Sequence, residues 1–140
     1  MNSISVFTDG GSRGNPGKAA IGVFIENEKK EVLVKIGKRI GVDTNNVAEY
    51  KAVTEAFNWL LANKNLFNQN TKIKFHMDSQ LVFSQLSGLF KVKNENIRSL
   101  IFTIRQQQQS LGLEVVWVHI PREKNHEADQ LVNLALDNLL

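Results

Sequence analysis

The sequence contains no cysteine among its 140 residues. Disulfide bonds, zinc-thiolate centres and thiol nucleophiles are therefore excluded together. No apolar run approaches the ~18 residues that a membrane-spanning helix needs. The opening residues MNSISVF carry neither a charged leader nor a hydrophobic segment of the kind that directs export. We therefore expect a cytoplasmic protein that makes no contact with membranes.

The composition is that of one ordinary globular domain. Hydrophobic residues make up 42% of the chain and charged residues 22%, which is close to the globular average. A chain of this length can bury most of its apolar surface in a single core. We expect one domain over residues 1–140, and a monomer. The net charge of +3 permits a polyanionic partner such as a nucleic acid without demanding one.

Strand and helix patterns alternate along the chain without internal repeats. Period-two alternation and β-rich composition predict five strands, at residues 3–9, 19–26, 31–38, 72–78 and 113–120. Capping residues and apolar side chains at helical spacing predict four helices, at residues 44–63, 79–88, 94–110 and 127–140. An antiparallel meander followed by βαβ units predicts a mixed sheet with helices on its faces.

The stretch FTDGGSRGNPG, residues 7–17, joins a carboxylate to unusually bare backbone. Asp9 ends the first predicted strand, and the residues after it are predicted to form a turn. A flexible turn explains one or two glycines, but not four of them around an Asn-Pro pair. Without a Cβ, the backbone of this segment can be approached closely.

Glu49 places a charge on an otherwise apolar helix face. It shares one helical stripe with Ala52, Val53, Ala56 and Leu60. Burying an unpaired carboxylate is costly, so such a position normally has a cation beside it. Alternatively, Glu49 lies in the first turn of its helix, where it caps the helix or meets the positive end of the dipole.

Two further acids have comparable positions. Asp78 terminates the strand at 72–78, and ligands bind at the carboxyl ends of strands in open α/β sheets. Its alternative role is to cap the following helix. Asp129 lies at the edge of an apolar helical stripe, and its alternative role is that of a first-turn acid favoured by the helix dipole.

Taken together, these acids predict a cation site. Asp9, Glu49, Asp78 and Asp129 all lie at element ends or on packed faces, where like charges repel unless a positive charge gathers them. Mg²⁺ accepts oxygen ligands without help from histidine or cysteine, and it is commonly shared with substrate phosphates. Two such ions can activate a water and stabilise the leaving oxygen in phosphodiester cleavage.

Four segments, FTDGGSRGNPGKAAIG, TNNVAEYKAV, MDSQLV and EKNHEADQLVNLAL, resemble type 1 ribonuclease H in that order and spacing. The resemblance is to the compact form seen in archaea and some bacteria, and it covers essentially the whole chain. It implies an α/β protein with the ribonuclease H-like fold. That fold is a five-stranded mixed sheet, antiparallel in its first three strands and flanked by α-helices.

The resemblance also implies a function. The family hydrolyses the RNA strand of RNA/DNA hybrids as a metal-dependent endonuclease, leaving 5'-phosphate and 3'-hydroxyl ends. Its acidic tetrad corresponds to Asp9, Glu49, Asp78 and Asp129, which are the implied catalytic residues and ligands of two Mg²⁺ ions, with Mn²⁺ as a substitute. The implied contacts with the hybrid are Gly10, Gly11, Ser12, Arg13, Gly14, Asn15, Asn46, Ser79 and Gln80. Because a DNA duplex lacks 2'-hydroxyl groups, a groove that reads them selects hybrids.

Two features depart from better-known bacterial members. A long basic protrusion is reduced here to SGLFKVKNENIRSL, where Lys91 and Lys93 are candidates for a smaller basic contact. An ordinary basic loop is the alternative. The loop before the last acid is short, so a mobile histidine found there in those members has no clear counterpart. Arg122 and His126 are auxiliary candidates, although a surface role for His126 and a structural role for His119 are the simpler interpretations.

Two other functions stay open at the level of sequence. One is a nuclease of the same fold that acts on another substrate, such as double-stranded RNA or a DNA primer junction. The other is a catalytically silent module that binds hybrids.

Overall fold

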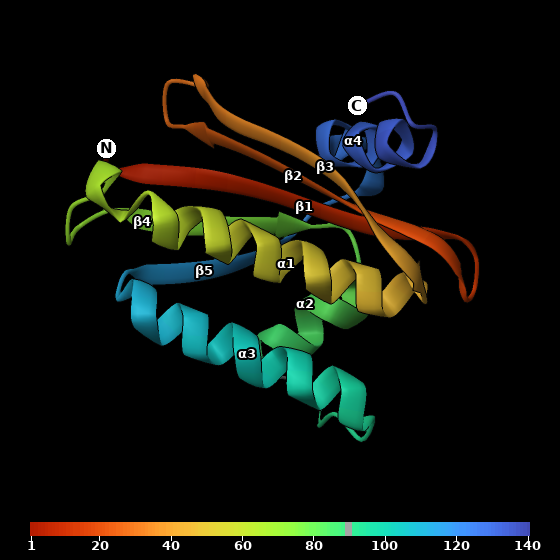
Figure 1. Ribbon diagram of the computed structural model, residues 1–140. Coiled ribbons are helices and arrows are strands. Elements are labelled where there is room, and N and C mark those ends of the chain that lie inside the picture. The colour runs from red at the N-terminus through yellow and green to blue at the C-terminus, as the bar shows by residue number, and fades with distance from the viewer. Residues whose placement is uncertain (89–90) are drawn as a thin grey trace.

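A computed structural model describes residues 1–88 and 91–140. Its centre is a five-stranded mixed sheet with the strand order β3-β2-β1-β4-β5 (Figure 1). The five-stranded mixed sheet and its flanking helices match the fold class predicted from the sequence.

The sheet combines an antiparallel and a parallel half. β1 (Ser3–Gly14), β2 (Gly17–Asn27) and β3 (Val32–Asp43) form the antiparallel meander. β4 (Lys72–Met77) pairs in parallel with β1, and β5 (Glu114–His119) pairs in parallel with β4. β1 is therefore the central strand, with one antiparallel and one parallel neighbour.

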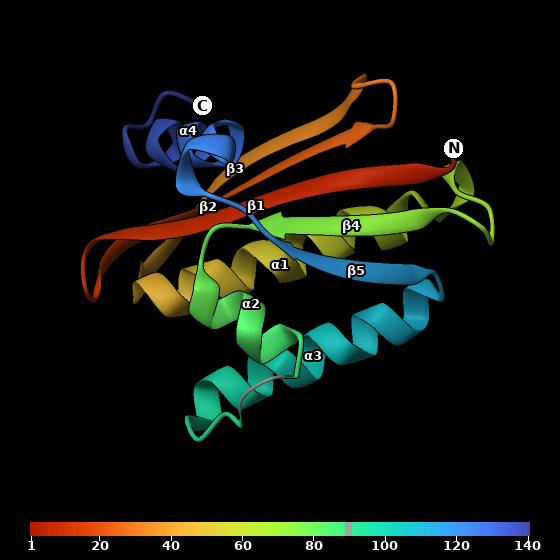
Figure 2. The same ribbon diagram turned by 180° about the vertical axis from the view of Figure 1, so that it is seen from behind.

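Helices cover the sheet on both sides. α1 (Asn45–Ala62) and α3 (Glu95–Leu111) lie on one side of the sheet together with the short α2 (Gln80–Leu86) (Figure 1). α4 (His126–Leu136) lies on the other side, over β1, β2 and β3 (Figure 2). Two 3₁₀ turns, η1 (Lys64–Leu66) and η2 (Arg122–Lys124), precede β4 and α4.

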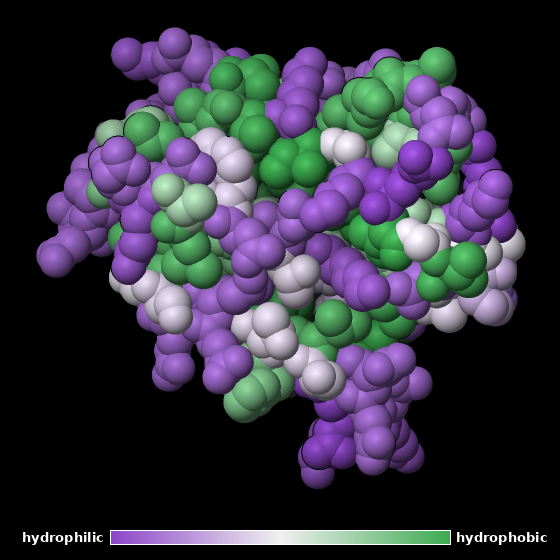
Figure 3. All heavy atoms as spheres, viewed as in Figure 1, coloured by the Kyte–Doolittle hydropathy of each residue, from purple (hydrophilic) through white to green (hydrophobic). Residues whose placement is uncertain are grey.

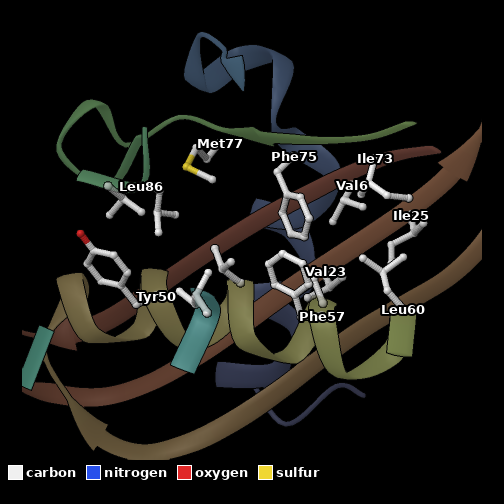
Figure 4. Close-up of a cluster of buried hydrophobic side chains, with 14 of the residues drawn as sticks. Val6, Val23, Ile25, Tyr50, Phe57, Leu60, Ile73, Phe75, Met77 and Leu86 are labelled. Atoms are coloured by element: carbon white, nitrogen blue, oxygen red, sulfur yellow. The ribbon is translucent and has the colours of Figure 1, made fainter. Parts of the chain in front are cut away.

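The main core fills the space between the sheet and α1. Phe75 of β4 stacks on Phe57 of α1 with ring centroids 4.7 Å apart (Figure 4). Val6, Ile73 and Leu60 surround this pair and are fully buried (Figure 4). Alternation along β1 and β4 sends Val6, Ile73 and Phe75 to one face, as the sequence pattern predicted. Most of the buried apolar surface, and hence most of the hydrophobic stabilisation, lies on this side.

α4 rests on a smaller apolar cluster of its own. Ala20 of β2 contacts Val132 and Ala135, and Leu136 packs against the three of them. None of the helices in residues 1–88 and 91–140 has both the length and the apolar character to span a bilayer. Hydrophilic and hydrophobic residues are interspersed over the face shown in Figure 3.

The prediction that the first strand ends at Asp9 is wrong. β1 continues to Gly14, and the reversal falls between Gly14 and Gly17. The reason is that β2 pairs with β1 all the way to this reversal, so ladder hydrogen bonds override the turn preference of the glycines. What stops early is the parallel neighbour, because the last β1–β4 pair is Phe7 with His76.

Other boundaries shift for local reasons. The last helix was predicted to reach residue 140, but it ends at Leu136, and Asn138 adopts a left-handed φ of 58° that cannot continue a helix. β3 runs to Asp43, beyond the predicted end at residue 38, because it stays paired with β2 to that point. Residues 89 and 90, within the segment predicted as a reduced basic contact, lie outside the described residues.

Two glycines let the helices approach β1 and β2 at backbone distance. A Cβ built on Gly10 would lie 2.3 Å from the carbonyl carbon of Ala48 and 2.4 Å from the backbone nitrogen of Glu49. A Cβ on Gly22 would lie 2.2 Å from the carbonyl oxygen of Ala128. Gly22 pairs directly with Asp9, the neighbour of Gly10. Because adjacent residues of a strand face opposite ways, α1 and α4 close on this point from opposite sides of the sheet.

We expect Gly10→Ala to lower the free energy of unfolding by at least about 1–3 kcal/mol, the usual cost of overpacking, because the helix backbone must move away. Gly11→Ala is the matched control, since a Cβ there would meet only the Cγ1 of Val132, at an ordinary 3.6 Å. Urea denaturation of both variants checks this prediction. Equal stability of the two variants would contradict it.

Candidate active site

Four carboxylates from four parts of the fold line one cavity of about 590 Å³. Asp9 belongs to β1, Glu49 to α1 and Asp129 to α4, while Asp78 directly follows β4. Carboxylate oxygens of Asp9, Glu49 and Asp78 lie within 4.8 Å of one another. Asp129 also lines the cavity and lies near enough to Asp9 for its charge to raise the pKa of Asp9. The four acids singled out in the sequence are therefore gathered at one place.

The end of β4 explains why this place is open. The parallel pairing stops at Phe7 and His76, so beyond it β1 has no neighbour on that edge. Asp9 lies just past this point, and Asp78 follows Met77, the last residue of β4. The capping role considered for Asp78 belongs instead to Ser79, whose Oγ accepts a hydrogen bond from the N–H of Val82. Asp78 is thereby left to face the cavity.

The first-turn alternative for Glu49 does not hold. α1 begins at Asn45 and is capped by Thr44, whose side chain accepts a hydrogen bond from the N–H of Val47. The first turn of α1 contains no acid, so Glu49 lies beyond the reach of that cap. Asp129 does lie in the first turn of α4, so the helix dipole favours its negative charge in addition to its place in the cluster.

Burial and like charge make the cluster unfavourable when fully ionised. Asp9 is 8% exposed, and its burial, followed by the charges of Asp78 and Asp129, raises its pKa to about 8. The N–H of Gly10 donates to Asp9 Oδ1 at 3.0 Å and opposes this shift. Burial and the charges of Asp9 and Asp78 raise the pKa of Glu49 well above its usual value, and the positive charge of Arg122 opposes that shift only weakly.

The donor set fits a hard divalent cation. All the clustered ligand atoms are carboxylate oxygens from Asp9, Glu49 and Asp78, which suit Mg²⁺ or Mn²⁺ and lack the nitrogen or sulfur that softer metals favour. A cation would also neutralise the repulsion that raises the pKa of Asp9 and Glu49. Charge, ligand type and spacing therefore agree.

The residues expected to contact nucleic acid divide into two groups. The first group lines the acid cavity and comprises Gly10, Gly11, Ser12, Arg13, Asn46 and Ser79. The second group lies beyond it: Gly14 and Asn15 form the tip of the β1–β2 hairpin, and Gln80 is exposed at the start of α2. Asn15 and Asn46 also line a neighbouring cavity of about 600 Å³. The structure thus places most, but not all, of the predicted contacts beside the acids.

Arg13 is engaged by an acid of the chain itself. Its guanidinium lies 2.6 Å from the carboxylate of Asp137, just after α4, and both side chains are about half exposed, at 51% and 46%. An ion pair this exposed contributes little to stability. Arg13 is therefore held at the rim of the cavity by a contact that a competing anion can replace.

The auxiliary candidates differ in their position relative to the cavity. Arg122 lines the cavity, whereas the His126 side chain is 70% exposed and pairs with Glu127 at 3.1 Å. His119 places Nε2 3.2 Å from the backbone oxygen of Asp78, which agrees with a structural role. Lys91 and Lys93 are both exposed, and Lys93 lines the neighbouring cavity with Asn15 and Asn46.

Sequence reasoning missed three asparagines near the site. Asn45 Oδ1 accepts a hydrogen bond from the N–H of Ser12 at 2.8 Å, and the N–H of Asn45 donates to Asn15 at 3.1 Å, so α1 is tied to the hairpin. Asn133 donates to the backbone oxygen of Asp129 at 3.1 Å. Asn125 is buried and hydrogen-bonded to Asp78. The sequence carries no signal for these roles, because Asn45 and Asn125 have polar neighbours and Asn133 lies on the exposed face of its helix.

The raised pKa of Asp9 predicts a pH-dependent stability in the absence of metal. Because the folded pKa is about 8 and the ordinary value is 3.8, folding favours the protonated form, and this contribution is lost as pH rises toward 8. Asp9→Asn mimics the protonated form. We expect its stability advantage over the wild type to grow between about pH 4 and about pH 8 and then to level off. Urea denaturation in chelator measures this difference, and an advantage that shrinks with rising pH would refute the assignment.

Comparison with known proteins places this geometry in a family. Residues 7–135 match the family model described as Reverse transcriptase-like. The structure aligns with LC11-RNase H1, isolated from compost, with a TM-score of 0.91 and 42% identity over 99% of this chain and 98% of that one. RNase H1 from Halobacterium salinarum aligns with a TM-score of 0.87 and 33% identity, over 97% of this chain and 98% of that one.

Sequence relatives agree with the structural ones. Ribonuclease HI of Halobacterium salinarum is 35% identical over 137 residues, which cover 96% of this chain and 65% of that protein. A bifunctional protein of Mycobacterium tuberculosis is 34% identical over 135 residues, which cover 96% of this chain and 35% of that protein. The chain thus spans only part of the length of these relatives. It belongs to the Reverse transcriptase-like family and, within that family, to type 1 ribonuclease H.

Proposed function

We propose that this chain hydrolyses the RNA strand of RNA/DNA hybrids and leaves 5'-phosphate and 3'-hydroxyl ends. The observation that carries the proposal is the gathering of Asp9, Glu49, Asp78 and Asp129 around one cavity. The similar LC11-RNase H1 has been solved in complex with an RNA/DNA hybrid, which supports the same class of substrate here. We assign the activity to residues 1–140 as one domain that acts as a monomer.

The acids would hold two divalent cations, Mg²⁺ or Mn²⁺. Asp9 is central to this assignment, because it neighbours each of the other three acids. When bound, such ions supply a nucleophilic water and stabilise the leaving oxygen. The carboxylates would position the ions, and the positive charge of the ions would offset the repulsion between the carboxylates.

The remaining residues of the cavity orient the hybrid. The bare backbone at Gly11 lets a sugar-phosphate strand approach β1, and Arg13 supplies a positive charge at the rim. The space that Gly10 leaves without a side chain is filled by the backbone of α1. Ser12 has a structural task in addition to the hybrid contact that the resemblance implies. Its N–H donates to Asn45, and its hydroxyl lies within hydrogen-bond reach of both Asn45 and the oxygen of Gly14, so Ser12 shapes the hairpin.

The proposed function also accounts for the cost of the cluster. A silent module that only binds hybrids has no need for buried carboxylates that repel one another. Hydrolysis does need them, because closely spaced carboxylate oxygens would hold the cations that fix the position of the scissile phosphate. The raised pKa of Asp9 and Glu49 therefore favours catalysis over binding alone.

We expect the wild type to cleave only the RNA strand of an end-labelled hybrid in Mg²⁺. Asp9→Asn should lower the cleavage rate at least ~100-fold, because losing a metal ligand costs more than losing an outer hydrogen-bond partner of one. Glu114→Gln is the matched control, because Glu114 is an exposed acid on β5. Cleavage of double-stranded RNA would shift the substrate assignment. Hybrid binding that persists in chelator, without cleavage in Mg²⁺ or Mn²⁺, would support the silent module instead.

We expect Arg13→Ala to weaken hybrid binding. It should also reduce the slope of log K against log salt concentration by about 1, the contribution of one phosphate contact. Asp137→Asn should strengthen binding, since it frees Arg13 from its internal partner. Titrations at several salt concentrations in the Asp9→Asn background measure both effects without cleavage. Arg39→Ala, an exposed arginine on β3, is the control. An unchanged salt slope in Arg13→Ala would remove Arg13 from the interface.

A further inference from the structure

Asn125 is a buried polar residue immediately before α4, and only 1% of its surface is exposed. Its side-chain Nδ2 donates one hydrogen bond to the backbone oxygen of Thr8 at 2.9 Å and another to Asp78 Oδ2 at 2.8 Å. Thr8 immediately precedes Asp9. One amide nitrogen therefore connects β1, next to Asp9, with the carboxylate of Asp78.

The backbone of Asn125 extends these connections. Its oxygen accepts a hydrogen bond from the N–H of Asp129 at 3.1 Å, and its N–H donates to the oxygen of Arg122 at 3.0 Å. Asn125 thus contacts Asp78 directly and is one backbone hydrogen bond from Asp129. It reaches Asp9 through the hydrogen bond to Thr8 and one peptide bond. Glu49 is the only acid of the four that Asn125 does not reach in this way.

The orientation of the amide follows from its partners. Both groups that face Nδ2 are acceptors, namely a backbone carbonyl and a carboxylate. A flipped amide would bring its own oxygen against both of them, so only the observed orientation is compatible with the site. Asn125 Oδ1 is then buried with no hydrogen-bond partner among the residues that the structure describes.

Asn125 gives up an ordinary structural role to make these contacts. It occupies the cap position of α4, where asparagine normally accepts a hydrogen bond from the first turn through its side-chain oxygen. Here that capping bond is not formed, and the side chain is turned to Asp78 instead. A residue chosen only to start the helix would use the oxygen that Asn125 leaves buried. Its placement therefore serves the carboxylate cluster.

We infer that Asn125 is a positioning residue that holds Asp78 beside Asp9 for cation binding. The inference rests on the proposed function, since it concerns the same site. With Oδ2 of Asp78 held by the neutral amide, its other oxygen would remain available to a cation. A neutral donor orients the ligand without neutralising it, as outer partners of metal ligands do.

The test measures metal binding in the absence of substrate. Calorimetric titration with Mn²⁺ compares the wild type with Asn125→Ala, and we expect the variant to bind about 10–100-fold more weakly. Asn70→Ala, an exposed loop asparagine, is the matched control and should bind Mn²⁺ like the wild type. If Asn125→Ala unfolds, Asn125→Leu keeps the buried volume while it removes both donors. Urea denaturation reports the folded fraction of each variant.

A second arm separates positioning from general loosening of the fold. In an Asp78→Asn background the ligand that Asn125 holds is already lost, so Asn125→Ala should then cause little further loss of Mn²⁺ affinity. Equal losses in both backgrounds would overturn the inference. So would unchanged Mn²⁺ affinity in a folded Asn125→Ala protein, although the proposed function would survive that result. A wild type that binds no Mn²⁺ at millimolar concentration would defeat the proposed function itself.

Discussion

Repulsion between crowded carboxylates is the constraint on which the arrangement of the site depends. Oxygens of Asp9, Glu49 and Asp78 lie within 4.8 Å of one another in a partly buried cavity. Such a cluster opposes folding until a cation enters it, so the stability of the chain must come from elsewhere. It comes from the apolar core between the sheet and α1, which surrounds Phe57 and Phe75. The apolar core thus stabilises the fold, and the carboxylate cluster, in a different region of the same sheet, forms the candidate active site.

The environment of the cluster consists mainly of neutral donors. Asn125 donates to Asp78, Asn133 donates to the backbone at Asp129, and the N–H of Gly10 donates to Asp9. Neutral donors hold a carboxylate in place while its charge remains available. A lysine or arginine in the same positions would compete with a cation for that charge. Two arginines line the cavity among the residues that the structure describes. Arg122 is exposed and weakly opposes the raised pKa of Glu49, and Arg13 pairs with Asp137 at the rim.

The gathering of the four acids was predictable from the sequence because all four lie at element ends or on packed faces, although Asp78 and Asp129 each have an ordinary helix-end explanation. Glu49 interrupts an apolar stripe, and Asp78 terminates an alternating strand. The end of β1 was not predictable in the same way, because the glycines after Asp9 favour a turn locally while pairing with β2 keeps them extended. Long-range contacts decide such cases. Asn125 shows the same limit, since its bond to Thr8 spans 117 residues and leaves no local pattern.

The close approach of the helices at Gly10 and Gly22 has a consequence for judging which relatives are active. The acids alone do not define a working site, because Glu49 and Asp129 are carried to it by helix backbones that touch these glycines. A relative could retain every carboxylate and still be inactive if a side chain at either position moved one helix outward. Inventories of catalytic groups would count such a protein as an enzyme. The two positions that carry no functional group therefore belong among the criteria for activity.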